Sequence, residues 1–360
     1  MTEFFFEYGL FVAKLFTFVV AVLLVVAAST FATRRVRKSL KGHIEINRVN
    51  DAVEAMRNAM DAGVSDPYSF KLHAKQRRKE KKQERKAQKK ALKQAATGDG
   101  DGETAVTTRS RVFVLDFHGD LRASAVSRLR REITALLTMA QKGDEVVVRL
   151  ESGGGMVHAY GLASSQLQRI KERGVELTVC VDKVAASGGY MMACVANRIL
   201  AAPFAVLGSI GVVAQLPNFN RLLKKNDIDF ELITAGEYKR TLTILGENTD
   251  KGREKFTEKI EDIHQLFKEF VSQHRPALDV EAVATGESWF GQRALDLALV
   301  DELTTSDEYI VKACETSDVV EVKYVEHRAF PKRLSAIFQD TVDGLLMRWW
   351  ERGTRARFFS

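Results

Sequence analysis

Ser187 is the residue best placed to do chemistry in this sequence. It follows a run rich in β-branched residues at 175–181, which predicts a buried strand, and precedes residues 190–196, which predict a helix. A hydroxyl at a strand-to-helix turn faces unpaired backbone N–H groups, and Gly188 lets the main chain approach a substrate closely. The Gly188 N–H can also point toward an oxyanion. This setting suits a nucleophile, although a serine before a helix is more often only a cap.

A serine nucleophile needs a base to take its proton. His118 and His158 lie in the same predicted domain, but neither stands beside a serine and a carboxylate that would single it out. Lys239 is the better candidate, because residues 241–245 after it are uncharged and mostly apolar. An amine acts as a base only when it is uncharged, and an apolar setting favours that form. The same residues fit a solvent-exposed lysine beside Arg240 at least equally well.

A second glycine-rich turn, at residues 152–155 (Ser-Gly-Gly-Gly), follows the strand predicted at 145–150. Parallel strands place ligands at their carboxyl ends, so this turn and the Ser187 turn are expected to face one cleft. Gly154 or Gly155 would then supply a second backbone N–H to the oxyanion. Three glycines in a row are also compatible with a merely flexible turn.

The elements that position these residues alternate between strands and helices. The chain has 360 residues, of which 45% are hydrophobic, enough to bury a full core. Strands are predicted at 111–117, 145–150, 175–181, 230–234 and 319–325, and helices at 123–141, 157–172, 190–196 and 251–273. This order predicts an α/β domain with parallel strands, and residues 195–213 are expected in its core. Cys180, Cys194 and Cys314 form no CxxC pair, so neither a zinc site nor a disulfide framework is indicated, and no cofactor is expected.

The N-terminal third has a different character. Residues 15–31 carry no charge over about the length of a membrane span, and the arginines and lysines at 34–41 predict that this flank stays in the cytosol. The formal net charge of +7 is concentrated in this third, above all at residues 71–93. Such a basic segment beside a membrane span favours contact with anionic lipid head groups. Nucleic acid is not the expected partner, because residues 71–93 contain no Phe, Tyr or Trp side chain on which bases could stack. The predicted parts are a transmembrane anchor (1–33), a basic, partly helical segment and linker (34–108), a catalytic domain (109–326), and an amphipathic helix with a basic tail (327–360).

Four motifs together resemble peptidase family S49, the signal peptide peptidase family of bacterial membrane serine proteases. They are Ser-Gly-Gly-Gly at 152–155, Ala-Ala-Ser-Gly-Gly-Tyr at 185–190, Gly-Ser-Ile-Gly-Val at 208–212 and Gly-Glu-Tyr-Lys at 236–239. The resemblance covers nearly the whole chain. It implies a Clp/crotonase-type fold of repeated ββα units and a Ser/Lys dyad of Ser187 and Lys239. It also implies a homo-oligomeric ring, an inner-membrane location, and extended peptides as substrates, such as signal-peptide remnants or misfolded membrane proteins.

The sequence departs from the family pattern at two positions. The first glycine turn usually reads Asn-Ser-Pro-Gly-Gly, whereas residues 151–155 read Glu-Ser-Gly-Gly-Gly, and Ala298 stands where glycine is commoner. Related enzymes are generally placed on the outer face of the membrane, whereas the basic flank predicts the cytosol. Two other functions stay open: a crotonase-like acyl-CoA enzyme, which would need a carboxylate acid or base in the cleft, and a non-catalytic scaffold that gathers partners through residues 43–96 and 334–360.

Overall fold

The computed structural model describes residues 42–66 and 109–326, together with positions 68, 75, 76, 79, 82, 83 and 86. The chain divides into two compact units. The larger unit is Ile46–Lys323, and the smaller one combines Met1–Glu45 with Tyr324–Ser360. Within the smaller unit, the Gly42 N–H donates to the Tyr324 hydroxyl at 2.8 Å.

The predicted membrane span at 15–31 and the predicted amphipathic helix at 334–351 lie outside the described residues. The basic segment at 71–93 is described only at isolated positions. None of the helices in the described ranges combines the length and the apolar character that a bilayer crossing requires.

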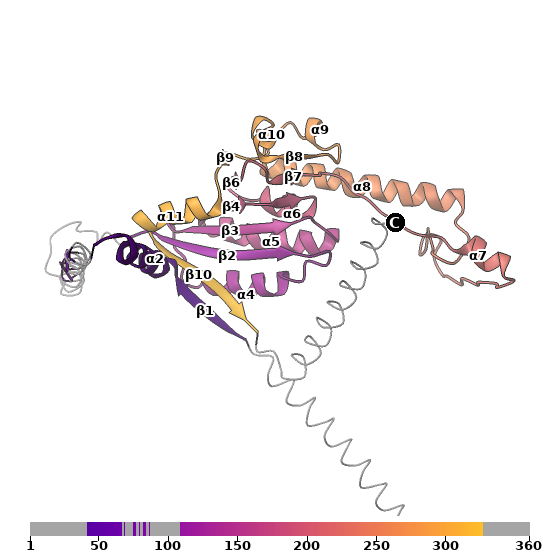
Figure 1. Ribbon diagram of the computed structural model, residues 1–360. Helices are drawn as coiled ribbons and strands as arrows, with labels where there is room; N and C mark the ends of the chain where they lie inside the picture. The colour runs from indigo at the N-terminus through magenta and orange to yellow at the C-terminus, as the bar shows by residue number, and fades with distance from the viewer. Residues whose placement is uncertain are drawn as a thin grey trace, which may run out of the picture. The chain divides into compact units, whose positions relative to one another are not determined.

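The larger unit is built on one sheet (Figure 1). The strands are β1 (His43–Arg48), β2 (Arg111–Gly119), β3 (Glu145–Ser152), β4 (Glu176–Val181), β5 (Val184–Ala186), β6 (Arg198–Ala201), β7 (Val206–Gly208), β8 (Ser288–Phe290), β9 (Glu302–Leu303) and β10 (Asp318–Val325). Their order is β1-β10-β2-β3-β4-β6-β9, and from β10 to β9 all neighbours run parallel. The predicted parallel α/β architecture is therefore confirmed.

A smaller set of strands extends from the end of β3. β5 pairs in parallel with β3 and with β7, and β7 pairs antiparallel with β8. The helices are α2 (Val49–Val64), α4 (Val126–Leu136), α5 (Val157–Glu172), α6 (Gly188–Ala193), α7 (Asn220–Lys225), α8 (Asp250–His274), α9 (Val280–Val283), α10 (Gly291–Asp296) and α11 (Ser306–Thr316). In chain order, β4-β5-α6 is a ββα unit that contains Ser187 between β5 and α6.

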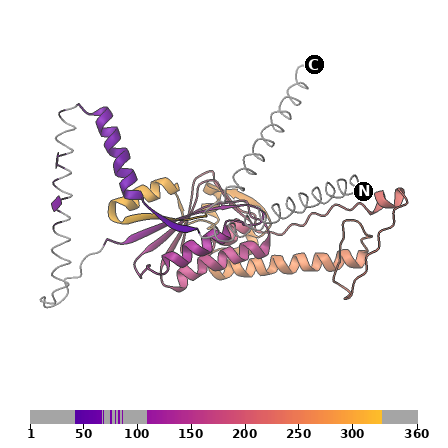
Figure 2. The same ribbon diagram turned by 90° about the horizontal axis from the view of Figure 1, so that it is seen from below.

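The two faces of the sheet are covered by different helices, as Figures 1 and 2 show. Because side chains alternate along a strand, odd-numbered residues of β2 such as Phe117 pack toward α5, where Phe117 meets Tyr160 edge-on. Even-numbered residues such as Val114 join a buried cluster with Ile310 of α11. The long apolar runs of the central strands follow from this burial on both faces.

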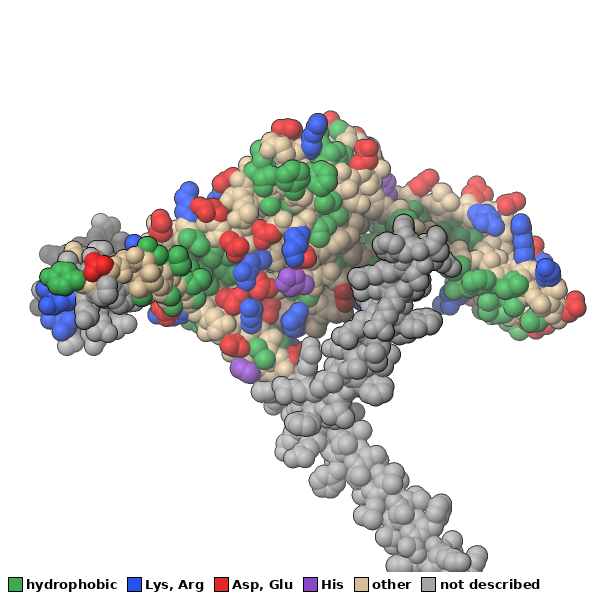
Figure 3. All heavy atoms as spheres, viewed as in Figure 1, with side chains coloured by type: hydrophobic (Ala, Val, Ile, Leu, Met, Phe, Trp, Pro, Cys, Tyr) green, Lys and Arg blue, Asp and Glu red, His purple; other side chains and the backbone are tan. Residues whose placement is uncertain are grey.

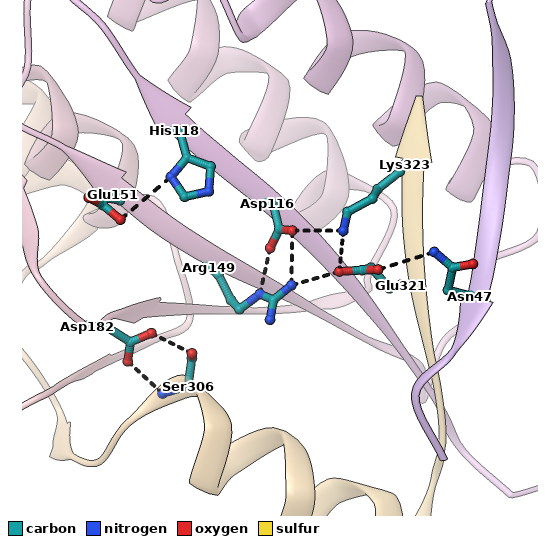
Figure 4. A network of polar contacts seen from close by, with 9 residues as sticks. All are labelled: Asn47, Asp116, His118, Arg149, Glu151, Asp182, Ser306, Glu321 and Lys323. Atoms are coloured by element: carbon teal, nitrogen blue, oxygen red, sulfur yellow. Dashed lines mark hydrogen bonds and ion pairs between the residues drawn. The ribbon is translucent and has the colours of Figure 1, made fainter. Parts of the chain in front are cut away.

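Beyond α11, the same face carries a network of charged side chains (Figure 4). The Arg149 guanidinium donates to Asp116 at 2.6 and 2.9 Å and to Glu321 at 2.7 Å, so it links β2, β3 and β10. Lys323 completes the network with an ion pair to Glu321 at 2.8 Å. Burial alone would raise the pKa of Asp116, but hydrogen bonds and the charge of Arg149, helped by Lys323, hold that pKa below its ordinary value. The network joins the late strand β10 to the centre of the sheet.

Several of the predicted elements differ from the structure. The helix predicted at 190–196 begins and ends earlier, since α6 spans Gly188–Ala193. Residues 230–234 were predicted as a strand, but they form no strand and are exposed, because no neighbouring strand is available to pair with them. The helix predicted at 123–141 is shorter, since α4 spans Val126–Leu136. Most of the apolar residues at 195–213 are buried, as predicted, but Phe204 and Val213 are exposed.

Ala298 follows the end of α10 and has a backbone φ of 59°. A Cβ disfavours this left-handed region and glycine does not, so Ala298→Gly is expected to raise the free energy of unfolding by about 0.5–1 kcal/mol. Chemical denaturation would measure the change. The matched control is Ala135→Gly inside α4, which is expected to lower the free energy of unfolding by about 0.5–1 kcal/mol. Equal destabilisation by both substitutions would contradict the strain assigned to Ala298.

Candidate active site

Ser187 forms a tight turn between β5 and α6, as the sequence predicted. Its backbone has φ 52° and ψ −118°, which is a strained conformation for a residue with a Cβ. Two backbone hydrogen bonds hold it there: the Ser187 N–H donates to Gly208 O at 2.8 Å, and the Met191 N–H donates to Ser187 O at 2.9 Å. A serine held in a strained strand-to-helix turn is the arrangement that exposes a nucleophilic hydroxyl.

The Ser187 side chain does not cap α6. Its hydroxyl accepts no hydrogen bond from the first turn of the helix. Within the described ranges it has no other hydrogen-bond partner either, and the residue is half-buried. The simpler interpretation of this serine, as a helix cap, is therefore not supported by the structure. The hydroxyl is left available for a substrate.

The two glycine-rich turns lie against one another. Gly154 has φ 88°, and a Cβ at this position would lie 2.7 Å from Gly188 N and 2.8 Å from Ser187 Cβ. Only a glycine allows this approach without displacing the serine turn. The two turns therefore lie side by side, as the expectation that they face one cleft requires.

The backbone N–H groups of the two turns differ in availability. The Gly154 N–H donates to Ser152 Oγ at 3.1 Å, and the Met156 N–H donates to Leu121 O at 2.9 Å. The Gly155 and Gly188 N–H groups have no hydrogen-bond partner among the residues that the structure describes. Both glycines are therefore able to donate to a bound oxyanion, whereas Gly154 is already engaged.

Lys239 is placed very differently from Ser187. It lies in the segment between β7 and α8, residues 212–249, which we call the arm; the arm carries α7 away from the sheet (Figures 1 and 2). The Lys239 side chain is exposed, and among the described residues it forms no hydrogen bond with Ser187. The apolar surroundings predicted for Lys239 are absent from the single chain, because the apolar residues of the arm are themselves exposed.

The turn that carries Lys239 is nevertheless anchored to α8. The Lys239 N–H closes the turn on Gly236 O at 3.1 Å. Lys251 donates to Glu237 at 2.6 Å, and its Nζ lies 5.9 Å from the centroid of the Tyr238 ring. These contacts fix the neighbours of Lys239 and leave its own side chain pointing into solvent.

The arm exposes an unusual amount of apolar surface, visible in Figure 3 around α7. The residues concerned are each at least 37% exposed, and Ile233 reaches 92%. They are Val213, Leu216, Phe219, Leu222, Ile228, Phe230, Leu232, Ile233, Tyr238, Ile244 and Leu245. Clustered apolar surface of this kind marks a protein interaction site.

Neither of the two candidate histidines, His118 and His158, forms a hydrogen bond with Ser187 among the described residues. His118 lies on the charged face of the sheet, where its Nδ1 is 3.6 Å from a carboxylate oxygen of Glu151 (Figure 4). His158 is exposed in the first turn of α5.

Comparisons with known proteins place the chain in a family. The model of the peptidase family S49 N-terminal region matches residues 3–167, and the peptidase family S49 model matches residues 169–320. The "Probable protease SohB" of Haemophilus influenzae is 47% identical over 349 residues, 97% of each chain. That of Buchnera aphidicola subsp. Acyrthosiphon pisum is 51% identical over 240 residues, 67% of this chain and 71% of the relative.

Similarity to a solved structure is weaker. A mutant of the 1510-N membrane-bound stomatin-specific protease has 14% identity and a TM-score of 0.39, over 57% of this chain and 84% of that chain. The sequence comparisons decide the class of the protein, which is a peptidase. The chain belongs to peptidase family S49, as the four motifs predicted.

Proposed function

We propose that this peptidase is a membrane-anchored serine endopeptidase with Ser187 as nucleophile and Lys239 as general base. The observation that carries the proposal is the strained, uncapped Ser187 turn packed against Gly154. The Gly188 N–H and the Gly155 N–H form the oxyanion site, because the Gly154 N–H is already bonded to Ser152. No metal or cofactor takes part in the proposed mechanism.

In this mechanism Ser187 Oγ bonds to the carbonyl carbon of the scissile peptide while its proton passes to the uncharged Nζ of Lys239. The carbonyl electrons move to oxygen, and the two backbone N–H groups stabilise the resulting oxyanion. The carbon–nitrogen bond then breaks, and Lys239 returns the proton to the leaving amine. Water attacks the acyl-enzyme, gives a proton to Lys239, and Ser187 recovers its hydroxyl as the acid product leaves.

The position of Lys239 supports a homo-oligomer in which one subunit supplies the serine and its neighbour the lysine. The arm holds the lysine turn rigidly on α8 and surrounds it with exposed apolar side chains. A second copy that covers this surface would remove water from around Lys239, and desolvation favours the uncharged amine that the mechanism requires. In a ring of such head-to-tail contacts, the apolar surface of every arm is covered by a neighbouring subunit.

The remaining parts of the proposal concern location and substrate. Residues 15–31 would anchor the protein in the bacterial inner membrane, with residues 71–93 against anionic head groups. Extended peptides, such as signal-peptide remnants or misfolded membrane proteins, would be the substrates, since an extended chain leaves its backbone carbonyl free to accept from the N–H groups of both glycine-rich turns.

Incubation of the full-length protein in detergent with an unfolded casein-type substrate, and separately with an acyl-CoA thioester, tests this function. We expect peptide products from the unfolded protein. Turnover of the thioester without proteolysis would support the crotonase-like alternative instead. Absence of both reactions in an assembled oligomer would favour the non-catalytic scaffold.

A further inference from the structure

Beneath the two glycine-rich turns lies a chain of buried hydrogen bonds that the proposed mechanism does not use. Ser152 ends β3 and is 1% exposed, and Tyr160 on α5 is fully buried. Their hydroxyl oxygens are 2.6 Å apart. The Tyr160 hydroxyl also donates to the backbone oxygen of Asp120 at 2.8 Å, and Ser152 Oγ accepts from the Gly154 N–H at 3.1 Å.

The direction of this chain follows from the number of protons. A tyrosine hydroxyl has one proton, and that of Tyr160 goes to Asp120 O. Ser152 must therefore donate its own proton to Tyr160 and accept from Gly154. Burial raises the pKa of Tyr160, which keeps its hydroxyl protonated. The bonds run in one direction from Gly154 through Ser152 and Tyr160 to Asp120, an arrangement in which each bond strengthens the next.

Tyr160 also supports the other side of the site. A Cβ on Gly188 would lie 2.5 Å from the Tyr160 ring, and a Cβ on Gly119 would lie 2.4 Å from the Tyr160 hydroxyl oxygen. The ring therefore packs directly under the peptide that follows Ser187. The same tyrosine fixes both turns, one through its hydroxyl and one through its ring.

We propose that Ser152 and Tyr160 are positioning residues of the oxyanion site, and this inference rests on the proposed peptidase function. By occupying the Gly154 N–H, they set the orientation of the turn and leave the next amide, that of Gly155, free to act with Gly188. Neither residue touches the substrate. Their hydroxyls act only through the backbone of the glycine turn.

The test compares Tyr160→Phe and Ser152→Ala with the wild type in the full-length oligomer. Removing a whole oxyanion donor lowers kcat by about 10²–10³-fold. These two substitutions only displace the donor, so each is expected to lower kcat by a smaller factor of about 10–100-fold. KM is expected to stay within about two-fold, because the hydrogen bond to the oxyanion strengthens only in the transition state. The double variant is expected to be no slower than the slower single variant, since both substitutions break one chain.

Ser164→Ala is the matched control. Ser164 lies one helical turn beyond Tyr160 and is equally buried, and its hydroxyl proton is shared between Tyr160 O at 3.0 Å and Met191 O at 2.9 Å. It is expected to lose thermal stability while keeping kcat. A peptide aldehyde, which forms an oxyanion when bound, gives the second readout: its affinity should fall in Tyr160→Phe by the same factor as kcat.

The inference is overturned if Tyr160→Phe and Ser152→Ala keep kcat within about two-fold of the wild type, or if Ser164→Ala loses as much kcat as they do. Failure of the proposed function would look different, because Ser187→Ala would then be as active as the wild type. If one variant does not fold, the other breaks the same chain and decides the result.

Discussion

Ser187→Ala and Lys239→Ala are each expected to lower the rate of protein cleavage by about 10⁴-fold or more, because a nucleophile and its base act as a unit. The measurement is the initial rate on an unfolded protein substrate, at equal concentrations of assembled enzyme. Lys225→Ala is the control, since Lys225 is another exposed lysine of the same arm. That variant removes the same charge and is expected to keep full activity.

A mixture of the two inactive variants identifies the chain that supplies the lysine. If Lys239 serves the Ser187 of a neighbouring subunit, a ring assembled from equal amounts of Ser187→Ala and Lys239→Ala chains has both groups intact at about one quarter of its sites. About one quarter of wild-type activity should therefore return after subunit exchange or co-expression. A mixture that stays inactive, with both single variants inactive, would place the lysine in the same chain as its serine.

If Lys239→Ala is as active as the wild type, this lysine has no part in the mechanism. Ser187 would then have to be activated by another base. Activity of Ser187→Ala equal to the wild type would refute the serine peptidase altogether.

The strands and helices that hold the serine turn could be read from the sequence. Parallel strands covered on both faces need apolar side chains at almost every position, so runs such as 145–150 stand out. Helix α5 begins and ends at the residues predicted, and the glycines beside Ser187 identify the turn. Strand β5 escaped prediction because three residues are too few to show a period of two.

The surroundings of Lys239, by contrast, were not predicted correctly from the sequence. Apolar neighbours predicted a shielded amine, yet in the single chain Lys239 is exposed, as are most of the apolar side chains of the arm. A sequence shows that side chains are apolar but not whether the same chain or another copy covers them. Ser152 and Tyr160 were missed for a different reason, because the hydrogen bonds from Ser152 to Tyr160 and from Tyr160 to Asp120 form only after the sheet and α5 have come together.

Gly154→Ala is expected to lower kcat by about 100-fold or more, which is the loss that a displacement of about 1 Å causes at a reacting group. The new Cβ would meet Gly188 N at 2.7 Å, Ala186 O at 2.8 Å and Ser187 Cβ at 2.8 Å. Two of these atoms belong to the backbone and the third carries the nucleophile, so relief of the contact must move the serine turn. The φ of 88° at Gly154 adds strain for any residue with a Cβ.

Gly153→Ala provides a closely matched comparison, because it makes the same chemical change one residue earlier in the same turn. Gly153 is exposed, and a Cβ there would have no heavy atom within 4 Å. Its kcat is expected to stay within about two-fold of the wild type. Thermal unfolding of both variants would show that each remains folded at the assay temperature. Should Gly154→Ala prove as active as Gly153→Ala, the close approach of the two turns would have no part in placing Ser187, since only the Gly154 side chain would reach it.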